Sequence, residues 1–114
     1  MLAMLMGLKT VSPKELHARL GDGALTVVDV NARHSWLKAH VPGALHLGVG
    51  TEFDAAGLPA DRNASLVFYC SNPLCMKAPG AARRATKLGY TDVRVLSAGI
   101  AGWTDGGFPV ESGA

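Results

Sequence analysis

One short run of mostly β-branched residues constrains the fold of this chain more than any other feature. It covers residues 25–30, reads Leu-Thr-Val-Val-Asp-Val, and shows almost no alternation between apolar and polar positions. Strands without alternation are usually buried on both faces, as they are in a parallel sheet. Three more short apolar runs predict strands over Ala44–Leu47, Leu66–Tyr69 and Val93–Leu96. The chain is therefore expected to form a parallel sheet.

Helical segments separate these predicted strands. The tetrapeptide at residues 12–15, Ser-Pro-Lys-Glu, is a capping box with proline at the first helical position, and it predicts a helix through about Leu20. Further helices are expected over about residues 34–38, 79–88 and 100–105. Strands that alternate with helices imply a parallel sheet with helices on both faces. The predicted fold class is α/β.

The chain is long enough for one domain and too short for two. It has 114 residues, so folding buries roughly two-thirds of the unfolded surface, enough for a core without metal or disulfide support. We place this domain at residues 12–111 and interpret residues 1–11 as an N-terminal arm with a first strand. The first eight residues are apolar, but they lack a basic segment and are far shorter than a membrane helix. We therefore expect a cytoplasmic protein without a membrane partner.

Charge and cysteine content exclude several classes of function. Eleven Lys and Arg against nine Asp and Glu leave a net charge of +2, which is too small to indicate nucleic-acid binding. Two cysteines cannot build the disulfide framework of a small secreted domain, and they are too few for a cysteine-only zinc site. His17, His34 and His46 are scattered without the spacing of metal ligands. No metal and no cofactor is expected.

Cys70 stands where a reactive side chain is expected in an α/β fold. It directly follows the predicted strand Leu66–Tyr69, and the loop after it leads to the helix that begins near Pro79. Ligands of such sheets bind beyond the carboxyl ends of the strands, where backbone N–H groups of a loop can converge and stabilise negative charge. A thiol at that point forms the nucleophilic thiolate more readily. The position alone also fits a buried cysteine that acts as a small hydrophobic residue.

Five segments, in order along the chain, resemble the rhodanese (sulfurtransferase) homology domain. They are Asp29-Val30, Ala39–Ala44 (Ala-His-Val-Pro-Gly-Ala), Val67–Cys70 (Val-Phe-Tyr-Cys), Ala98–Trp103 (Ala-Gly-Ile-Ala-Gly-Trp) and Gly107–Val110 (Gly-Phe-Pro-Val). Each segment is a weak signal by itself, but the ordered set is strong and spans about residues 12–111. The resemblance implies a single domain with a five-stranded parallel sheet flanked by helices on both faces.

The resemblance also implies the residues of a site. Cys70 is then the catalytic residue, which accepts sulfane sulfur as a persulfide and passes it to a thiophilic acceptor. The residues of the following loop are expected to bind the substrate: Ser71, Asn72, Pro73, Leu74, Cys75, Met76 and Lys77. Asp29 and Arg33 are expected to support the site, and the role of Asp29 is structural rather than catalytic. Gly99 and Gly102 are expected to allow close backbone approach near the loop.

The loop departs from the family pattern Cys-x-x-Gly-x-Arg at two positions. Pro73 stands where glycine is usual, and Cys75 stands where arginine is usual. The dual-specificity phosphatases that share the fold place arginine six positions after the cysteine, where this chain has Met76, so tight bidentate phosphate binding is not expected. After the first long strand, Asn31 takes the place of a family arginine, and Arg33 is a candidate substitute.

The second cysteine leaves two interpretations open. Cys75 follows Cys70 by five positions, and a disulfide between them needs Cα atoms within about 7 Å. If the two meet, Cys75 can resolve a persulfide or sulfenate on Cys70, releasing sulfide or protecting the site. Otherwise Cys75 is a loop cysteine packed against apolar neighbours such as Leu74. Lys77 is either a point charge for a bound anion or a solvated lysine.

The leading hypothesis is a single-domain sulfurtransferase that carries a persulfide on Cys70. Its expected partners are a small sulfur donor, of the thiosulfate or persulfide type, and a thiol acceptor, which can be a protein. One alternative is a thiol-redox enzyme, similar to an oxyanion reductase, that uses Cys70 and Cys75 as a couple. Another is a regulatory module that keeps the fold without catalysis. We expect a monomer or homodimer.

Overall fold

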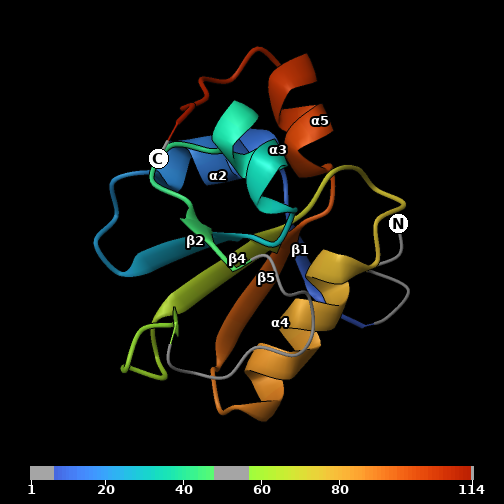
Figure 1. Cartoon of the computed structure of the whole chain (residues 1–114). Coiled ribbons are helices and arrows are strands. Elements are labelled where there is room, and N and C mark those ends of the chain that lie inside the picture. The colour runs from blue at the N-terminus through green and yellow to red at the C-terminus, as the bar shows by residue number, and fades with distance from the viewer. Residues whose placement is uncertain (1–6, 48–56, 114) are drawn as a thin grey trace.

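Five strands and four helices make up the part of the chain that the computed structural model describes, residues 7–47 and 57–113 (Figure 1). In chain order they are β1 (Lys9–Val11), α2 (Pro13–Arg19), β2 (Leu25–Asp29), α3 (Arg33–Lys38), β3 (Leu45–His46), β4 (Ser65–Tyr69), α4 (Lys77–Lys87), β5 (Asp92–Leu96) and α5 (Gly99–Asp105). Residues 1–6 of the expected N-terminal arm and residues 48–56 after β3 lie outside the described residues. No described helix has the length and apolar character needed to span a bilayer.

The five strands form one parallel sheet in the order β1-β5-β4-β2-β3. β4 is the central strand, and it pairs with β2 on one side and with β5 on the other. The predicted α/β class and five-stranded parallel sheet are therefore confirmed. The strand expected over Ala44–Leu47 is shorter than predicted, because β3 pairs with β2 through Leu45 and His46 alone at the edge of the sheet.

The central strand is buried on both faces, which explains its unbroken apolar sequence. Leu66 and Phe68 pack in the core beneath α4, whereas Val67 and Tyr69 pack in the core that includes residues of α2 and α5. Each of these four side chains is at most 1% exposed. Figure 1 shows α4 on the face of the sheet opposite α2, α3 and α5. Helices thus cover both faces, as the alternation of elements predicts.

Small side chains let α4 lie close to the sheet. Its buried alanines contact the core beside β4 and β5, and none is more than 1% exposed: Ala78, Ala81, Ala82 and Ala85. The helix begins at Lys77, two residues before its predicted start at Pro79. Pro79 therefore lies in the first turn, where a residue without an N–H leaves no intrahelical hydrogen bond unmade.

Local interactions fix the helices on the other face. Ser12 Oγ accepts from the N–H of Glu15 at 3.1 Å, and the N–H of Ser12 donates to Glu15 Oε1 at 2.9 Å, so the predicted capping box at the start of α2 is confirmed. In α5, Trp103 is fully buried and its indole N–H donates to the carbonyl of Pro109 at 2.6 Å. Its ring lies 5.0 Å from that of Phe108. The segment after α5 is thereby held on the domain.

Candidate active site

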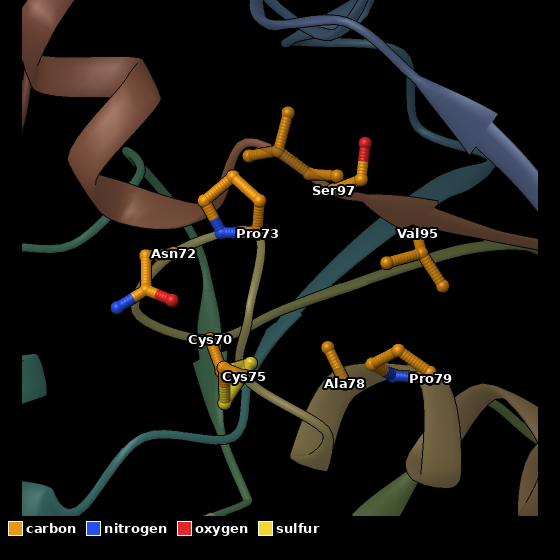
Figure 2. A pocket seen from close by; sticks show the side chains of 9 residues that line it. Cys70, Asn72, Pro73, Cys75, Ala78, Pro79, Val95 and Ser97 are labelled. Carbon is orange, nitrogen blue, oxygen red and sulfur yellow. A yellow bond between two sulfur atoms is a disulfide. The ribbon is translucent and has the colours of Figure 1, made fainter. Parts of the chain in front are cut away.

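Cys70 lies directly after β4, at the carboxyl edge of the sheet, and begins the loop that leads to α4 (Figure 2). A small cavity separates it from the end of β5. The cavity is lined by Cys70, Asn72, Pro73, Cys75, Ala78, Pro79, Val95, Leu96 and Ser97. Its volume is about 10 Å³, which is room for barely one water molecule. In this form the cavity has no room beside Cys70 for a molecule larger than water.

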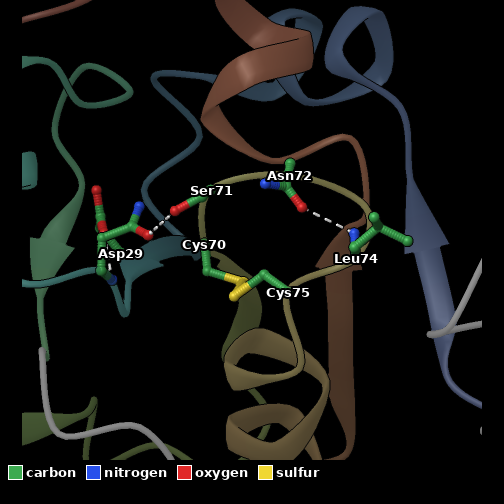
Figure 3. The surroundings of a disulfide bond; sticks show 7 residues. Asp29, Cys70, Ser71, Asn72, Leu74 and Cys75 are labelled. Carbon is green, nitrogen blue, oxygen red and sulfur yellow. Dashed lines mark hydrogen bonds between the residues drawn. A yellow bond between two sulfur atoms is a disulfide. The ribbon is translucent and has the colours of Figure 1, made fainter.

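A disulfide joins Cys70 to Cys75 across this loop (Figure 3). Their Cα atoms lie 6.4 Å apart, within the range that a disulfide requires. Cys75 packs against the core below α4, whereas its neighbour Leu74 is 81% exposed. Of the two interpretations of Cys75, the structure shows the meeting with Cys70 rather than packing against Leu74. That meeting is the geometric condition for a resolving role.

The two sulfur-bearing side chains differ in their access to solvent. Cys70 is 2% exposed and belongs to the core under α4, whereas Cys75 is half-buried. In the disulfide form, Cys70 thus has apolar surroundings on one side and faces the small cavity on the other. A disulfide sulfur is not a nucleophile, so chemistry that begins with a Cys70 thiolate requires reduction of the bond.

The hydrogen bonds within the loop belong to this closed form. The side-chain oxygen of Asn72 accepts from the N–H of Leu74 at 2.9 Å, and its carbonyl accepts from the N–H of Cys75 at 3.1 Å (Figure 3). The sequence predicts that N–H groups of this loop converge on Cys70. Here two of them, those of Leu74 and Cys75, donate to Asn72 instead.

The first turn of α5 holds one side of the loop. The N–H of Ile100 donates to the carbonyl of Cys70, and the N–H of Ala101 donates to the carbonyl of Ser71, both at 2.9 Å. Gly99 makes this approach possible, because a Cβ at its position would lie 2.6 Å from the carbonyl carbon of Ser71. Its φ of +67° also favours glycine. The close backbone approach predicted for Gly99 is confirmed. At Gly102 an added Cβ would instead overlap the Cβ of Ala98, at the start of α5.

Buried polar groups at the end of β2 and just after it hold the other side of the loop. The carboxylate of Asp29 accepts from the N–H of Asn31 at 2.7 Å, and Asn31 Oδ1 accepts from the Ser71 hydroxyl at 2.8 Å. Asp29 is fully buried and Asn31 is 5% exposed. Burial raises the pKa of Asp29, while the hydroxyl of Tyr69 and the N–H of Asn31 favour the charged form and oppose that rise. Asp29 is therefore connected to the loop indirectly, through the hydrogen bonds of Asn31.

Asn31 stands out in the sequence as the residue that replaces an arginine, and its bridge to Ser71 was not predicted. A signal was available, because a polar residue just past the end of the strand beside β4 must lie at the same sheet edge as Cys70. Arg33, the candidate substitute for that arginine, lies in the first turn of α3 and is exposed. Its guanidinium carbon lies 5.9 Å from the ring centroid of Trp36 rather than in the Cys70 cavity.

The predicted substrate-binding residues fall into two groups. Those that line the cavity beside Cys70 are Asn72, Pro73 and Cys75. Those that lie exposed around it are Ser71, Leu74, Met76 and Lys77. Within residues 7–47 and 57–113, the cavity lining contains no lysine or arginine, and no three His, Cys, Asp or Glu side chains gather as metal ligands. The cavity therefore offers no fixed cationic side chain to an anionic donor.

Comparisons with known proteins match this architecture. The family model of the rhodanese-like domain matches residues 12–105. A curated protein, the HTH-type transcriptional regulator Rv0324 of Mycobacterium tuberculosis (strain ATCC 25618 / H37Rv), is 34% identical over 105 residues. That match covers 91% of this chain and 45% of the regulator, so the chain spans less than half of the regulator's length.

Solved structures share the fold over most of the chain. The BH2092 protein from Bacillus halodurans matches with a TM-score of 0.84 at 24% identity, over 96% of this chain and 80% of that one. SseA of Escherichia coli, a 3-mercaptopyruvate sulfotransferase, matches with a TM-score of 0.75 at 20% identity, over 94% and 52% of the two chains. The human single-domain sulfurtransferase TSTD1 matches with a TM-score of 0.68 at 27% identity, over 84% and 95%.

Replacing Gly99 with alanine is expected to push the loop away from α5. The new Cβ would overlap the Ser71 carbonyl carbon and would also sit at a positive φ. Gly107→Ala is the matched control, because Gly107 has a φ of +77° with no atom within 4 Å of the added Cβ. In urea denaturation we expect Gly99→Ala to lower the free energy of unfolding by about 2–4 kcal/mol and Gly107→Ala by about 1 kcal/mol. Equal losses would contradict the close approach.

The pH dependence of stability tests the buried carboxyl group of Asp29. Because burial raises its pKa in the folded state above the unfolded value, its ionisation costs stability as pH rises through the raised pKa. The variant Asp29→Asn cannot ionise at this position. In urea denaturation between about pH 4 and pH 8, we expect the wild type to lose stability relative to Asp29→Asn as pH rises. A difference that is constant, or that moves the other way, would be inconsistent with a raised pKa.

Proposed function

The chain belongs to the rhodanese-like domain family, and we propose that it is a sulfurtransferase that carries sulfane sulfur as a persulfide on Cys70. The observation that carries this proposal is the position of Cys70. It directly follows the central strand, so it lies at the carboxyl edge of the sheet and at the start of the loop to α4. Ligands of parallel α/β sheets bind at this edge. The human single-domain sulfurtransferase TSTD1 and the 3-mercaptopyruvate sulfotransferase SseA share the fold.

The reaction starts from a Cys70 thiolate, which reduction of the Cys70–Cys75 disulfide supplies. The thiolate attacks the outer sulfur of the donor. A new sulfur–sulfur bond forms at Cys70 Sγ, the donor's own sulfur–sulfur bond breaks, and its electron pair leaves with the rest of the donor. An acceptor thiolate then attacks the outer sulfur of the Cys70 persulfide, and Cys70 leaves as a thiolate. The cycle moves one neutral sulfur atom and returns the protein to its starting state.

The lining of the cavity favours a thiol persulfide over a dianion such as thiosulfate. The described lining residues include no lysine or arginine, and Cys75 occupies the position where the family pattern has arginine. Moving a dianion out of water is costly without a fixed positive charge or several hydrogen-bond donors. Leu74 and Met76, 81% and 54% exposed, lie on the same loop and provide apolar surface for a protein acceptor. A persulfide donor and a thiol acceptor, which can be a protein, fit these features.

Mass spectrometry of the Cys70 peptide tests the proposed function. The chain is reduced, freed of reductant, treated with glutathione persulfide or thiosulfate, and alkylated. We expect one added sulfur atom on Cys70 from the persulfide and a lower yield from thiosulfate. In Cys75→Ser, Cys70 is the one cysteine left, so the added sulfur is assigned without ambiguity. Cys70→Ser is the matched variant that should lose it.

The contradicting result is a Cys70 that alkylation shows to be reduced and that takes up no sulfur from either donor. Finding the added sulfur on Cys75 in place of Cys70 would contradict the proposal equally, because Cys75 does not follow the central strand.

A further inference from the structure

We propose that Cys75 is a resolving cysteine, which releases the sulfur of the Cys70 persulfide as sulfide and leaves the Cys70–Cys75 disulfide behind. This inference rests on the proposed persulfide on Cys70. It gives the site a second outcome, because sulfur can leave as sulfide when no acceptor thiol collects it. It also adds a dithiol reductant to the partners of the domain. The structure contains the protein product of this step, the disulfide itself.

The loop brings Cys75 to the inner sulfur of such a persulfide. The Cα atoms of the two cysteines are 6.4 Å apart, and the chain between them turns back through Asn72, which accepts the N–H groups of Leu74 and Cys75. Figure 3 shows the two cysteine side chains directed toward each other across the base of this turn. The atom to which Cys75 is bonded is Cys70 Sγ, which is the inner sulfur of the persulfide. Attack at that atom releases the outer sulfur.

The step balances in atoms and electrons. The thiolate of Cys75 attacks Sγ of the protonated persulfide, and a bond forms between the two cysteine sulfurs. The bond between Sγ and the outer sulfur breaks, and its electron pair leaves with the outer sulfur and its proton as HS⁻. The sulfane sulfur is reduced by two electrons, and the cysteine pair is oxidised by two. An external dithiol then reduces the disulfide and becomes a disulfide itself, which restores both thiols.

The different exposure of the two cysteines sets the direction of the reducing step. Cys70 is 2% exposed, whereas Cys75 is half-buried on a loop whose neighbouring residues, Leu74 and Met76, are exposed. A dithiol therefore reaches the sulfur of Cys75 first and forms a mixed disulfide there. Cys70 leaves as the thiolate, at the strand end where the next donor binds. Reduction thus regenerates the nucleophile and opens the loop in one event.

A single-turnover experiment tests the resolving role. Reduced wild type and Cys75→Ser are loaded with glutathione persulfide, freed of small thiols, and checked for equal persulfide on Cys70. Released sulfide and the Cys70–Cys75 disulfide are then followed over time. We expect about one sulfide per disulfide formed in the wild type, and a release at least about tenfold slower in Cys75→Ser, because a neighbouring thiol acts at high effective concentration. Cys75→Ala is the second variant, in case serine disturbs the loop.

Two controls show that the attack is intramolecular. The rate in the wild type should not change when the protein is diluted. Persulfide-loaded Cys75→Ser, mixed with reduced Cys70→Ser, offers the Cys75 thiol from another molecule and should release sulfide no faster than loaded Cys75→Ser alone. As a separate measurement, glutathione added to the oxidised wild type should be trapped in a mixed disulfide on Cys75 rather than on Cys70.

The outcomes separate this inference from the proposed function. If no form of the chain takes up sulfur on Cys70, the proposed function fails and this inference fails with it. If Cys70 is loaded but the wild type and both Cys75 variants release sulfide at the same rate, the resolving role alone is wrong. It is also wrong if the added sulfur moves to Cys75, because Cys75 then attacks the outer sulfur.

Discussion

The packing of β4 on both faces is the constraint on which the rest of the site depends. Leu66 and Phe68 fill the core under α4, and Val67 and Tyr69 fill the opposite core. The strand cannot shift along its axis without exposing these side chains, and truncating one buried phenylalanine alone costs about 3–5 kcal/mol. The point at which β4 ends is therefore fixed. Cys70 is the next residue, so it is held in place at the carboxyl edge of the sheet.

The loop after Cys70 is anchored at its base and closed on itself at its tip. At the base, N–H groups of α5 donate to the carbonyls of Cys70 and Ser71, an approach that Gly99 makes possible. The hydroxyl of Ser71 also donates to the side chain of Asn31. The turn itself is held by the hydrogen bonds that Asn72 accepts from Leu74 and Cys75, and the disulfide joins its two ends. Reduction removes the link between the two ends and leaves the contacts of Cys70 and Ser71 with α5 intact. Cys70 therefore keeps its place while Cys75 is free to approach or withdraw.

The features that could be predicted from sequence depend on local patterns. The unbroken apolar run at residues 25–30 and the capping box at 12–15 gave correct elements, because burial on two faces and helix capping each leave a short signature. Whether Cys70 and Cys75 meet could not be decided from the sequence, because their approach depends on how the loop turns between them, which includes the two hydrogen bonds accepted by Asn72. The link from Asn31 to Ser71 spans forty positions, and no periodicity records a contact of that kind. The length of β3 was likewise not predictable from its own residues. It is shorter than expected because this edge strand pairs with β2 at two positions alone.

We propose that Cys70, at the carboxyl edge of the sheet, carries the sulfur and that Cys75, on the same loop, determines how the sulfur leaves. The most direct measurement follows radioactive sulfane sulfur from a labelled glutathione persulfide through one turnover of the reduced chain. We expect the label to appear first on the Cys70 peptide and then in free sulfide, in step with formation of the disulfide. Label that reaches sulfide without ever residing on Cys70 would contradict it.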